Sequence, residues 1–183
     1  MMVTALSTLP EPLFALGATA DTARAAHAWS LLDRVADPEI PVISVCELGI
    51  VRAVRVEGER VEVDVTPTYS GCPATEVIAA DIRAALIDGG FEDAVVRMVL
   101  SPPWTTAAIS ETGRARLRAY GIAPPGPVAP DALRPVRFAR RLVACPQCGS
   151  EDTERLAEFG STACKALYRC RACREPFDYF KPL

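Results

Sequence analysis

Four of the seven cysteines form two Cys-x-x-Cys pairs near the end of the chain. Cys145 and Cys148 make the first pair, Cys170 and Cys173 make the second, and 21 residues separate the two pairs. Zinc ribbons typically have about 15–20 residues at this place, so the spacing is slightly long. Two such turns can direct four thiolates at one Zn²⁺ ion, which then has no open position for a substrate. The spacing therefore predicts a structural zinc site, with iron in a rubredoxin-like site as the main alternative.

Cys72 is a candidate of a different kind, because it directly precedes Pro73. Proline suits the first position of a helix, so we expect Cys72 to be the N-cap of the helix that follows. Free N–H groups and the positive end of the helix dipole lower a thiol pKa there, and they favour a thiolate for metal binding or exchange. Gly71 would permit another molecule to approach closely. The alternative is a half-buried cysteine that only caps the helix.

Three other residues could support chemistry at Cys72. Asp37 and Glu39 lie in a proline turn, where carboxylates usually cap or face solvent, but near Cys72 they could help to hold iron. Cys164 lies in the tail outside both pairs, and it could be a packed thiol, a redox partner or a ligand of a transient cluster. By itself the sequence favours the packed thiol. Cys46 is surrounded by apolar residues and is predicted to be core filler without chemistry.

The elements that must position these residues are expected to form a compact α+β domain. Hydrophobic periodicity predicts helices from Thr22 onward, after the loop at residues 66–73, and over residues 105–120. Alternating or apolar runs predict strands at residues 51–56, 61–66 and 94–100, and the last of these is apolar enough to be central. This order gives a hairpin and one crossover on a small mixed three-stranded sheet, with helices packed on it.

Proline content predicts where the domains divide. Residues 123–135 contain five prolines and are expected to be an extended linker. Before it we expect the main domain at residues 22–122, and after it a Cys₄ zinc ribbon at residues 136–183. Residues 1–21 show no period and are expected to be flexible.

Composition excludes several classes of protein. The chain is 50% hydrophobic and 23% charged with a net charge of −3, which is typical of a globular protein and not of a nucleic-acid binder. The tail is basic, but its cations would offset the negative charge of four metal-bound thiolates. The sequence has no apolar run of the ~20 residues that span a bilayer and no basic leader, so we expect a cytoplasmic protein without a membrane partner.

Absent motifs argue against stand-alone catalysis. His27 is the only histidine, so neither a di-iron Glu-x-x-His site nor a three-histidine zinc site can form. No glycine-rich phosphate loop is present. Oxygenase, hydrolase or nucleotide-driven chemistry by this chain alone is therefore not expected.

Several motifs resemble those of known families. Those of the main domain are similar to the SufT-type iron–sulfur assembly factors, and they are residues 37–41 (DPEIP), 48–51 (LGIV), 66–76 (TPTYSGCPATE) and 103–105 (PWT). The tail, at residues 159–170 (FGSTACKALYRC) and 173–180 (CREPFDYF), resembles the D-subunit (PaaD) family of phenylacetyl-CoA epoxidase systems. The resemblance covers nearly everything from about residue 28 onward except the linker.

This resemblance implies a maturation subunit for aerobic phenylacetate breakdown. The family's epoxidase uses a di-iron oxygenase subunit and a reductase with flavin and a [2Fe–2S] cluster, so these subunits, and iron–sulfur assembly proteins, are the implied partners. On the matching positions Cys72 is the functional thiol and the four paired cysteines are the ribbon ligands. We expect Cys72 to hold iron or an iron–sulfur cluster transiently, while the ribbon docks the client subunit.

Two other hypotheses compete with maturation. The chain could be a non-catalytic structural subunit that stays in the oxygenase complex and bridges its components. The ribbon could instead bind nucleic acid, although the acidic main domain argues against this.

Overall fold

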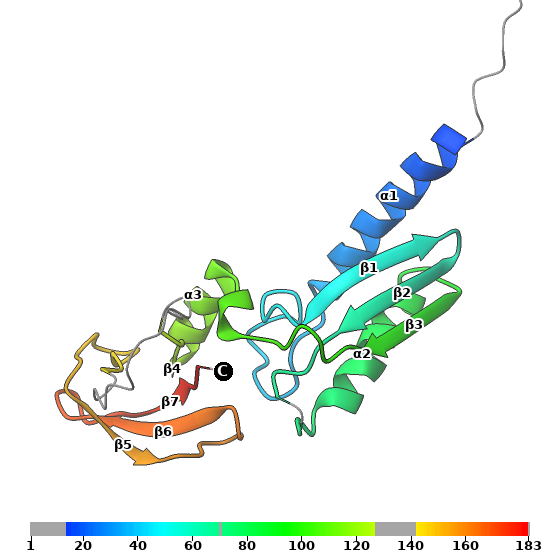
Figure 1. The fold of residues 1–183 in the computed structure, drawn as a ribbon. Coiled ribbons are helices and arrows are strands. Elements are labelled where there is room, and N and C mark those ends of the chain that lie inside the picture. Colours follow the sequence, from blue (N-terminus) through cyan, green and yellow to red (C-terminus); the bar gives the residue numbers. More distant parts are fainter. Residues whose placement is uncertain (1–13, 70, 127–141, 183) are drawn as a thin grey trace, which may run out of the picture.

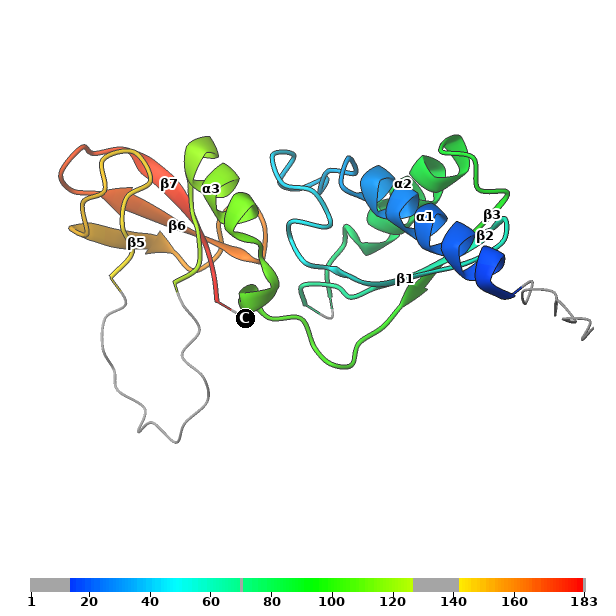
Figure 2. The same cartoon turned by 90° about the horizontal axis from the view of Figure 1, so that it is seen from above.

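The computed structural model describes residues 14–69, 71–126 and 142–182, and it contains two sheets built from different parts of the chain (Figure 1). The first unit follows the order α1 (Phe14–Leu32), β1 (Val51–Glu57), β2 (Arg60–Val65), α2 (Thr75–Asp88) and β3 (Asp93–Met98). Both helices lie on one face of its sheet (Figure 2). The predicted α+β class, with a hairpin followed by one crossover, is therefore confirmed.

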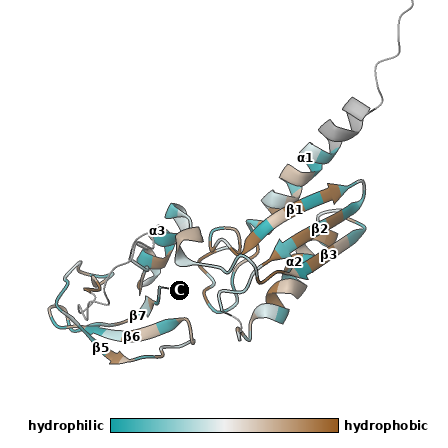
Figure 3. Ribbon diagram, in the orientation of Figure 1, coloured by the Kyte–Doolittle hydropathy of each residue, from teal (hydrophilic) through white to brown (hydrophobic). Residues whose placement is uncertain are grey.

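The central strand of the first sheet is β2, which is antiparallel to β1 and parallel to β3. Along β2, buried valines alternate with Glu62 and Asp64, which form ion pairs with Arg55 of β1 and Arg97 of β3. The same alternation of hydrophobic and hydrophilic residues is visible in Figure 3. The prediction that residues 94–100 form the central strand is wrong. The hairpin already occupies one side of β2, so the crossover through α2 adds β3 at the opposite edge.

The helix at the start of the chain is longer than the sequence predicted. It begins at Phe14 and not at Thr22, so the segment 1–21, which was expected to be flexible, is helical from residue 14 onward. The other part of that segment, residues 1–13, lies outside the described residues. Helix α1 ends after Leu32, shortly before the proline turn that contains Asp37 and Glu39. No helix in the described part of the chain is long and apolar enough to cross a membrane.

The single helix predicted over residues 105–120 is divided in two. A short 3₁₀ turn at Thr106–Ala108 precedes α3 (Glu111–Tyr120). The division falls at Ser110, because its hydroxyl accepts a hydrogen bond from the Gly113 N–H and so caps a new helix.

The second sheet has the strand order β4-β7-β6-β5, made from β4 (Ile122–Ala123), β5 (Thr153–Ala157), β6 (Lys165–Cys170) and β7 (Pro176–Phe180). Strand β4 runs parallel to β7. Residues 122 and 123, which were assigned to the main domain and to the linker, therefore form one strand of this sheet. Residues 127–135 of the predicted linker lie outside the described residues.

The second sheet is joined to the first unit by side chains that share one core. Phe180, at the end of β7, is 1% exposed and belongs to the cluster of buried residues formed by the first unit. Its ring lies 6.0 Å from that of Trp104, and the Trp104 indole donates a hydrogen bond to the Leu48 carbonyl at 3.0 Å. Cys164, just before β6, belongs to the same cluster. The ribbon is therefore packed against the first unit.

Replacing Phe180 by alanine should destabilise the whole chain. The change removes a fully buried ring and leaves a cavity at the junction of the two units, which typically costs about 3–5 kcal/mol. Urea unfolding measures this loss, with Phe159→Ala as the control because the Phe159 side chain is exposed. Equal effects of the two changes would contradict a shared core.

Candidate functional site

A small cavity opens beside the carboxyl end of β2, and it gathers the four residues outside the ribbon that the sequence indicated for chemistry. Fifteen residues line this Cys72 cavity, and the titratable ones are Asp37, Glu39, Cys72 and Cys164. The lining residues of the first unit come from residues 37–40, 48–50, 65–68, 72–78 and Met98, and the β6–β7 hairpin adds Cys164 at its start and Phe180 at its end. Its volume of about 20 Å³ is enough for roughly one water molecule or ion.

The two carboxylates come from the turn that follows α1. Asp37 is 6% exposed, and its Oδ1 accepts hydrogen bonds from the N–H groups of Glu39 at 2.9 Å and Ile40 at 2.8 Å. Burial raises the pKa of Asp37, and these two N–H groups oppose the change. Burial and then the neighbouring Asp37 raise the pKa of Glu39. Asp37 thus caps the turn, as its sequence setting suggested, and also faces the cavity.

Cys72 lies near the start of α2 but is not its N-cap. The helix begins at Thr75 with Ala74 as the N-cap, so Cys72 lies outside the helix proper. Burial raises the pKa of the Cys72 thiol, the Ala74 N–H lowers it, and the negative charge of Glu39 raises it further. The expected lowering of this pKa is therefore wrong, because desolvation and nearby carboxylates outweigh the local N–H groups.

The Cys72 side chain is still partly accessible to solvent. Its side chain is half-buried, and Gly71 beside it is exposed. Burial raises the pKa of Tyr69, and the nearby Cys72 raises it further. Sequence reasoning missed Tyr69, which stands in the same motif as Cys72.

Cys164 reaches this cavity from the other sheet. It is 5% exposed and lies 3.0 Å from the Thr162 hydroxyl. Burial raises its pKa most, and Glu39 and Asp37 raise it further. The next residue, Lys165, is also buried and pairs with Asp178 at 3.8 Å. The positive charge of Lys165 lowers the pKa of Asp37 and of Glu39, so this cation of the tail acts on the carboxylates of the Cys72 cavity.

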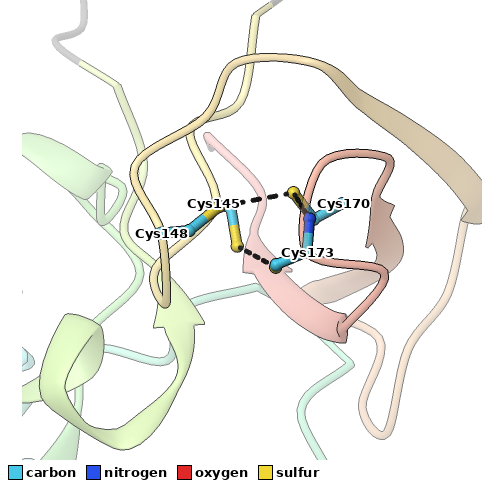
Figure 4. Close-up of side chains that lie close together, drawn as sticks. All are labelled: Cys145, Cys148, Cys170 and Cys173. Carbon is cyan, nitrogen blue, oxygen red and sulfur yellow. Dashed lines mark hydrogen bonds between the residues drawn. The ribbon is translucent and has the colours of Figure 1, made fainter.

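The four paired cysteines, here called the ribbon quartet, converge as the spacing predicted (Figure 4). Their sulfur atoms all lie within 4.8 Å of one another, with Cys145 and Cys173 at 3.7 Å and Cys148 and Cys170 at 3.6 Å. A tetrahedral ion with bonds of ~2.3 Å to sulfur needs about 3.8 Å between ligands. The donor set and its geometry therefore fit a closed four-sulfur metal site.

The backbone of the Cys-x-x-Cys turns also supports a four-sulfur metal site. The Cys173 N–H points at the Cys170 sulfur at 3.4 Å, and this N–H lowers the pKa of Cys170 to about 7. Among the described residues, the quartet is the only group of three or more potential metal ligands gathered this closely. Asp37, Glu39, Cys72 and Cys164 are thus not gathered as closely as the four ribbon cysteines.

Cys46 takes no part in either site. It is half-buried against the core of the first unit, and burial raises its pKa to about 12. The predicted packing of Cys46 among apolar residues is confirmed, and its lack of chemistry stays a prediction. Cys46 therefore provides a control for substitutions at the other cysteines.

Comparison with known proteins identifies the family. Residues 130–181 match the PaaD zinc beta ribbon domain, and residues 26–97 match the iron-sulfur cluster assembly protein family. A protein of Escherichia coli (strain K12), provisionally named as the D-subunit of 1,2-phenylacetyl-CoA epoxidase, is 50% identical over 153 residues, which cover 84% of this chain and 90% of that protein. The chain belongs to the PaaD family of phenylacetyl-CoA epoxidase systems.

Two further comparisons concern the first unit of this PaaD family member. The Fe-S protein maturation auxiliary factor SufT of Staphylococcus aureus (strain USA300) is 36% identical over 85 residues, which cover 45% of this chain and 96% of SufT. A Bacillus anthracis protein, solved as a domain of unknown function DUF59, is 25% identical with a TM-score of 0.52, over 55% of this chain and 96% of that one. The resemblance to SufT-type proteins is therefore confirmed for the first unit.

Replacing Cys148 by serine should release the metal of the ribbon. The remaining three thiolates cannot close the tetrahedral site, whose binding free energy also stabilises the fold of a small ribbon. Elemental analysis after dialysis should give about one metal ion per chain for wild type and less than about a tenth of that for Cys148→Ser. Cys46→Ser should retain the metal, and retention by Cys148→Ser as well would contradict the four-sulfur assignment.

The raised pKa of Cys72 should appear in its reaction with iodoacetamide. Only the thiolate reacts, so alkylation of Cys72 should be slower in the folded protein than in urea at pH 8, and should rise about tenfold per pH unit below its pKa. Mass spectrometry of the Cys72 peptide measures this rate. Faster alkylation in the folded protein than in urea would contradict the raised pKa and support the lowered pKa that the sequence alone predicted.

Proposed function

We propose that this chain is a maturation subunit of a phenylacetyl-CoA epoxidase system, in which Cys72 holds iron or an iron–sulfur cluster for transfer to a client subunit. The observation that carries the proposal is the Cys72 cavity, where a half-buried thiol faces the carboxylates of Asp37 and Glu39. Similarity to the E. coli relative and to SufT supports the same role.

The chemistry of the cavity suits a transient metal cargo. Thiolates favour iron over magnesium or calcium, and carboxylates can complete its coordination. The thiol proton is strongly held because of burial and the nearby carboxylates, and a cation would displace it to water and satisfy the same negative groups.

The ribbon quartet has a separate role in this proposal. Four sulfurs leave no open position, so a zinc ion held by them would be structural and would not exchange with the client. The ion would fix the two knuckles and so stabilise the sheet that packs against the Cys72 cavity. The ribbon would also help to dock the client, for which we propose the di-iron oxygenase subunit or the [2Fe–2S] reductase subunit.

Cys72→Ser should prevent maturation without unfolding the chain. Epoxidase subunits produced together with this variant should contain less than about a tenth of the iron found with wild type, because a hydroxyl is a poor ligand for iron at neutral pH. Iron analysis and activity of the purified oxygenase and reductase measure the effect. Cys46→Ser is the matched control, and full iron loading with Cys72→Ser would reject the proposal.

A bridging role is the second candidate, and the name of the E. coli relative as a subunit favours it. In that case the chain would remain in the purified, active complex in stoichiometric amount. Activity of that complex would then be indifferent to Cys72→Ser.

A further inference from the structure

The ribbon quartet has one buried and one accessible cysteine in each Cys-x-x-Cys turn. The first cysteines of the two turns, Cys145 and Cys170, are 2% and 0% exposed. The second cysteines, Cys148 and Cys173, are both accessible to solvent. A reagent in solution can therefore reach the metal site at one cysteine of each turn, although the other two ligands are covered by protein.

The shortest sulfur–sulfur contacts cross from one turn to the other. The sulfurs of Cys148 and Cys170 are 3.6 Å apart and those of Cys145 and Cys173 are 3.7 Å apart, as the dashed lines in Figure 4 mark. Each contact joins an accessible cysteine to a buried one. A disulfide bond is about 2.05 Å long, so each pair needs to approach by roughly 1.6 Å to form one.

An open hollow adjoins the second turn. Its volume is about 350 Å³, and it is lined by Cys170 and by three arginines, Arg169, Arg171 and Arg174. This is many times the volume of a water-sized oxidant such as hydrogen peroxide. Arg169 and Arg171 are both paired with Glu154, whereas Arg174 forms no ion pair with a described residue. Its charge is therefore available to stabilise an anion that leaves beside the quartet.

The chemistry of a four-thiolate site determines what an oxidant does there. Metal-bound cysteines are thiolates, which is the form that peroxides oxidise, and oxidation follows exposure. Zn²⁺ has no redox chemistry of its own, so the electrons must come from sulfur. A disulfide is a far weaker ligand than two thiolates, and the ion leaves when the thiolates are consumed.

We propose that the ribbon quartet is a site of reversible oxidation by hydroperoxides, at which two disulfides that cross between the turns replace the bound ion. The Cys148 thiolate attacks one oxygen of hydrogen peroxide, the O–O bond breaks, and a sulfenic acid and a hydroxide form. The Cys170 thiolate then attacks the sulfenic sulfur and displaces a second hydroxide. One peroxide thus accepts two electrons from two thiolates, and Cys173 with Cys145 repeats the sequence.

This inference goes beyond the proposed function, because it concerns the ribbon and not the cargo at Cys72. Disulfides across the turns would keep the two turns joined after the ion has left. Disulfides within the turns would leave them separate. The sheet that carries Cys164 and Phe180 would therefore keep its place during oxidation, and a dithiol together with fresh zinc would restore the metal site.

Zinc release and disulfide mapping test the proposal on the unmodified chain. Zinc-filled protein is treated with excess hydrogen peroxide, a chromogenic chelator reports free zinc, and mass spectrometry identifies the linked peptides. About one zinc ion per chain should leave as the Cys148–Cys170 and Cys145–Cys173 disulfides form, and dithiothreitol with zinc should reverse both changes. Retained zinc, disulfides within the turns, or irreversible sulfinic acids would overturn the proposal.

The cysteines outside the quartet provide matched controls. Cys46→Ser and Cys72→Ser should release zinc at the wild-type rate, because neither residue belongs to the quartet. Thermal unfolding of the zinc-filled variants shows that each is folded. Slower release by a folded variant would mean that oxidation reaches the ribbon through that thiol, which would overturn direct attack on the quartet.

The crossed pairing also predicts a difference in stability. Zinc-free oxidised protein should unfold at a higher temperature than zinc-free reduced protein, because each disulfide links turns that are 21 residues apart. Calorimetry measures both midpoints, and the reduced form is prepared with a chelator and a dithiol. Equal midpoints would contradict disulfides that join the two turns.

Discussion

The packing of Phe180 into the core of the first unit is the contact on which the arrangement of both sites depends. A ribbon of this size has little core of its own, because its buried cluster contains few large side chains. Metal binding can order the two knuckles, but it does not determine where the ribbon lies. The ring of Phe180 against Trp104 fixes that position, and with it the position of Cys164.

The two groups of cysteines differ in how closely their members are gathered. In the ribbon quartet the four sulfurs lie within 4.8 Å of one another, and their pKa values shift in opposite directions, since that of Cys170 is lowered to about 7 and that of Cys173 is raised to about 12. In the Cys72 cavity, burial and two carboxylates raise the pKa of both thiols. Each thiol there therefore holds its proton more firmly than an ordinary cysteine, and any metal ion would have to displace that proton.

Local patterns predicted much of the fold. The alternating valines of β2 and the Cys-x-x-Cys spacing each depend on contacts within one element or one turn, and the structure agrees with both. The edge position of β3 was missed because strand order depends on connections between elements. The cap at Ser110 was missed because a single serine inside an amphipathic pattern is a weak signal.

The candidate site was predictable only in part. The family motifs indicated Cys72, Asp37 and Glu39, which do lie together. No periodicity could indicate that Cys164 joins them, since the contact spans two sheets and about half of the chain. The direction of the Cys72 pKa shift could also not be predicted from the sequence, because it depends on burial and on carboxylates that are distant in sequence.

The short strand β4 has a consequence for dividing the chain. Residues Ile122–Ala123 pair with one edge of β7, although they lie where the proline-rich stretch begins and a cut within or after that stretch would remove them. A fragment that begins after this stretch would leave the backbone N–H and C=O groups of β7 unpaired and its apolar face uncovered. Such an edge recruits strands from other molecules, so the isolated ribbon would self-associate even with its metal bound.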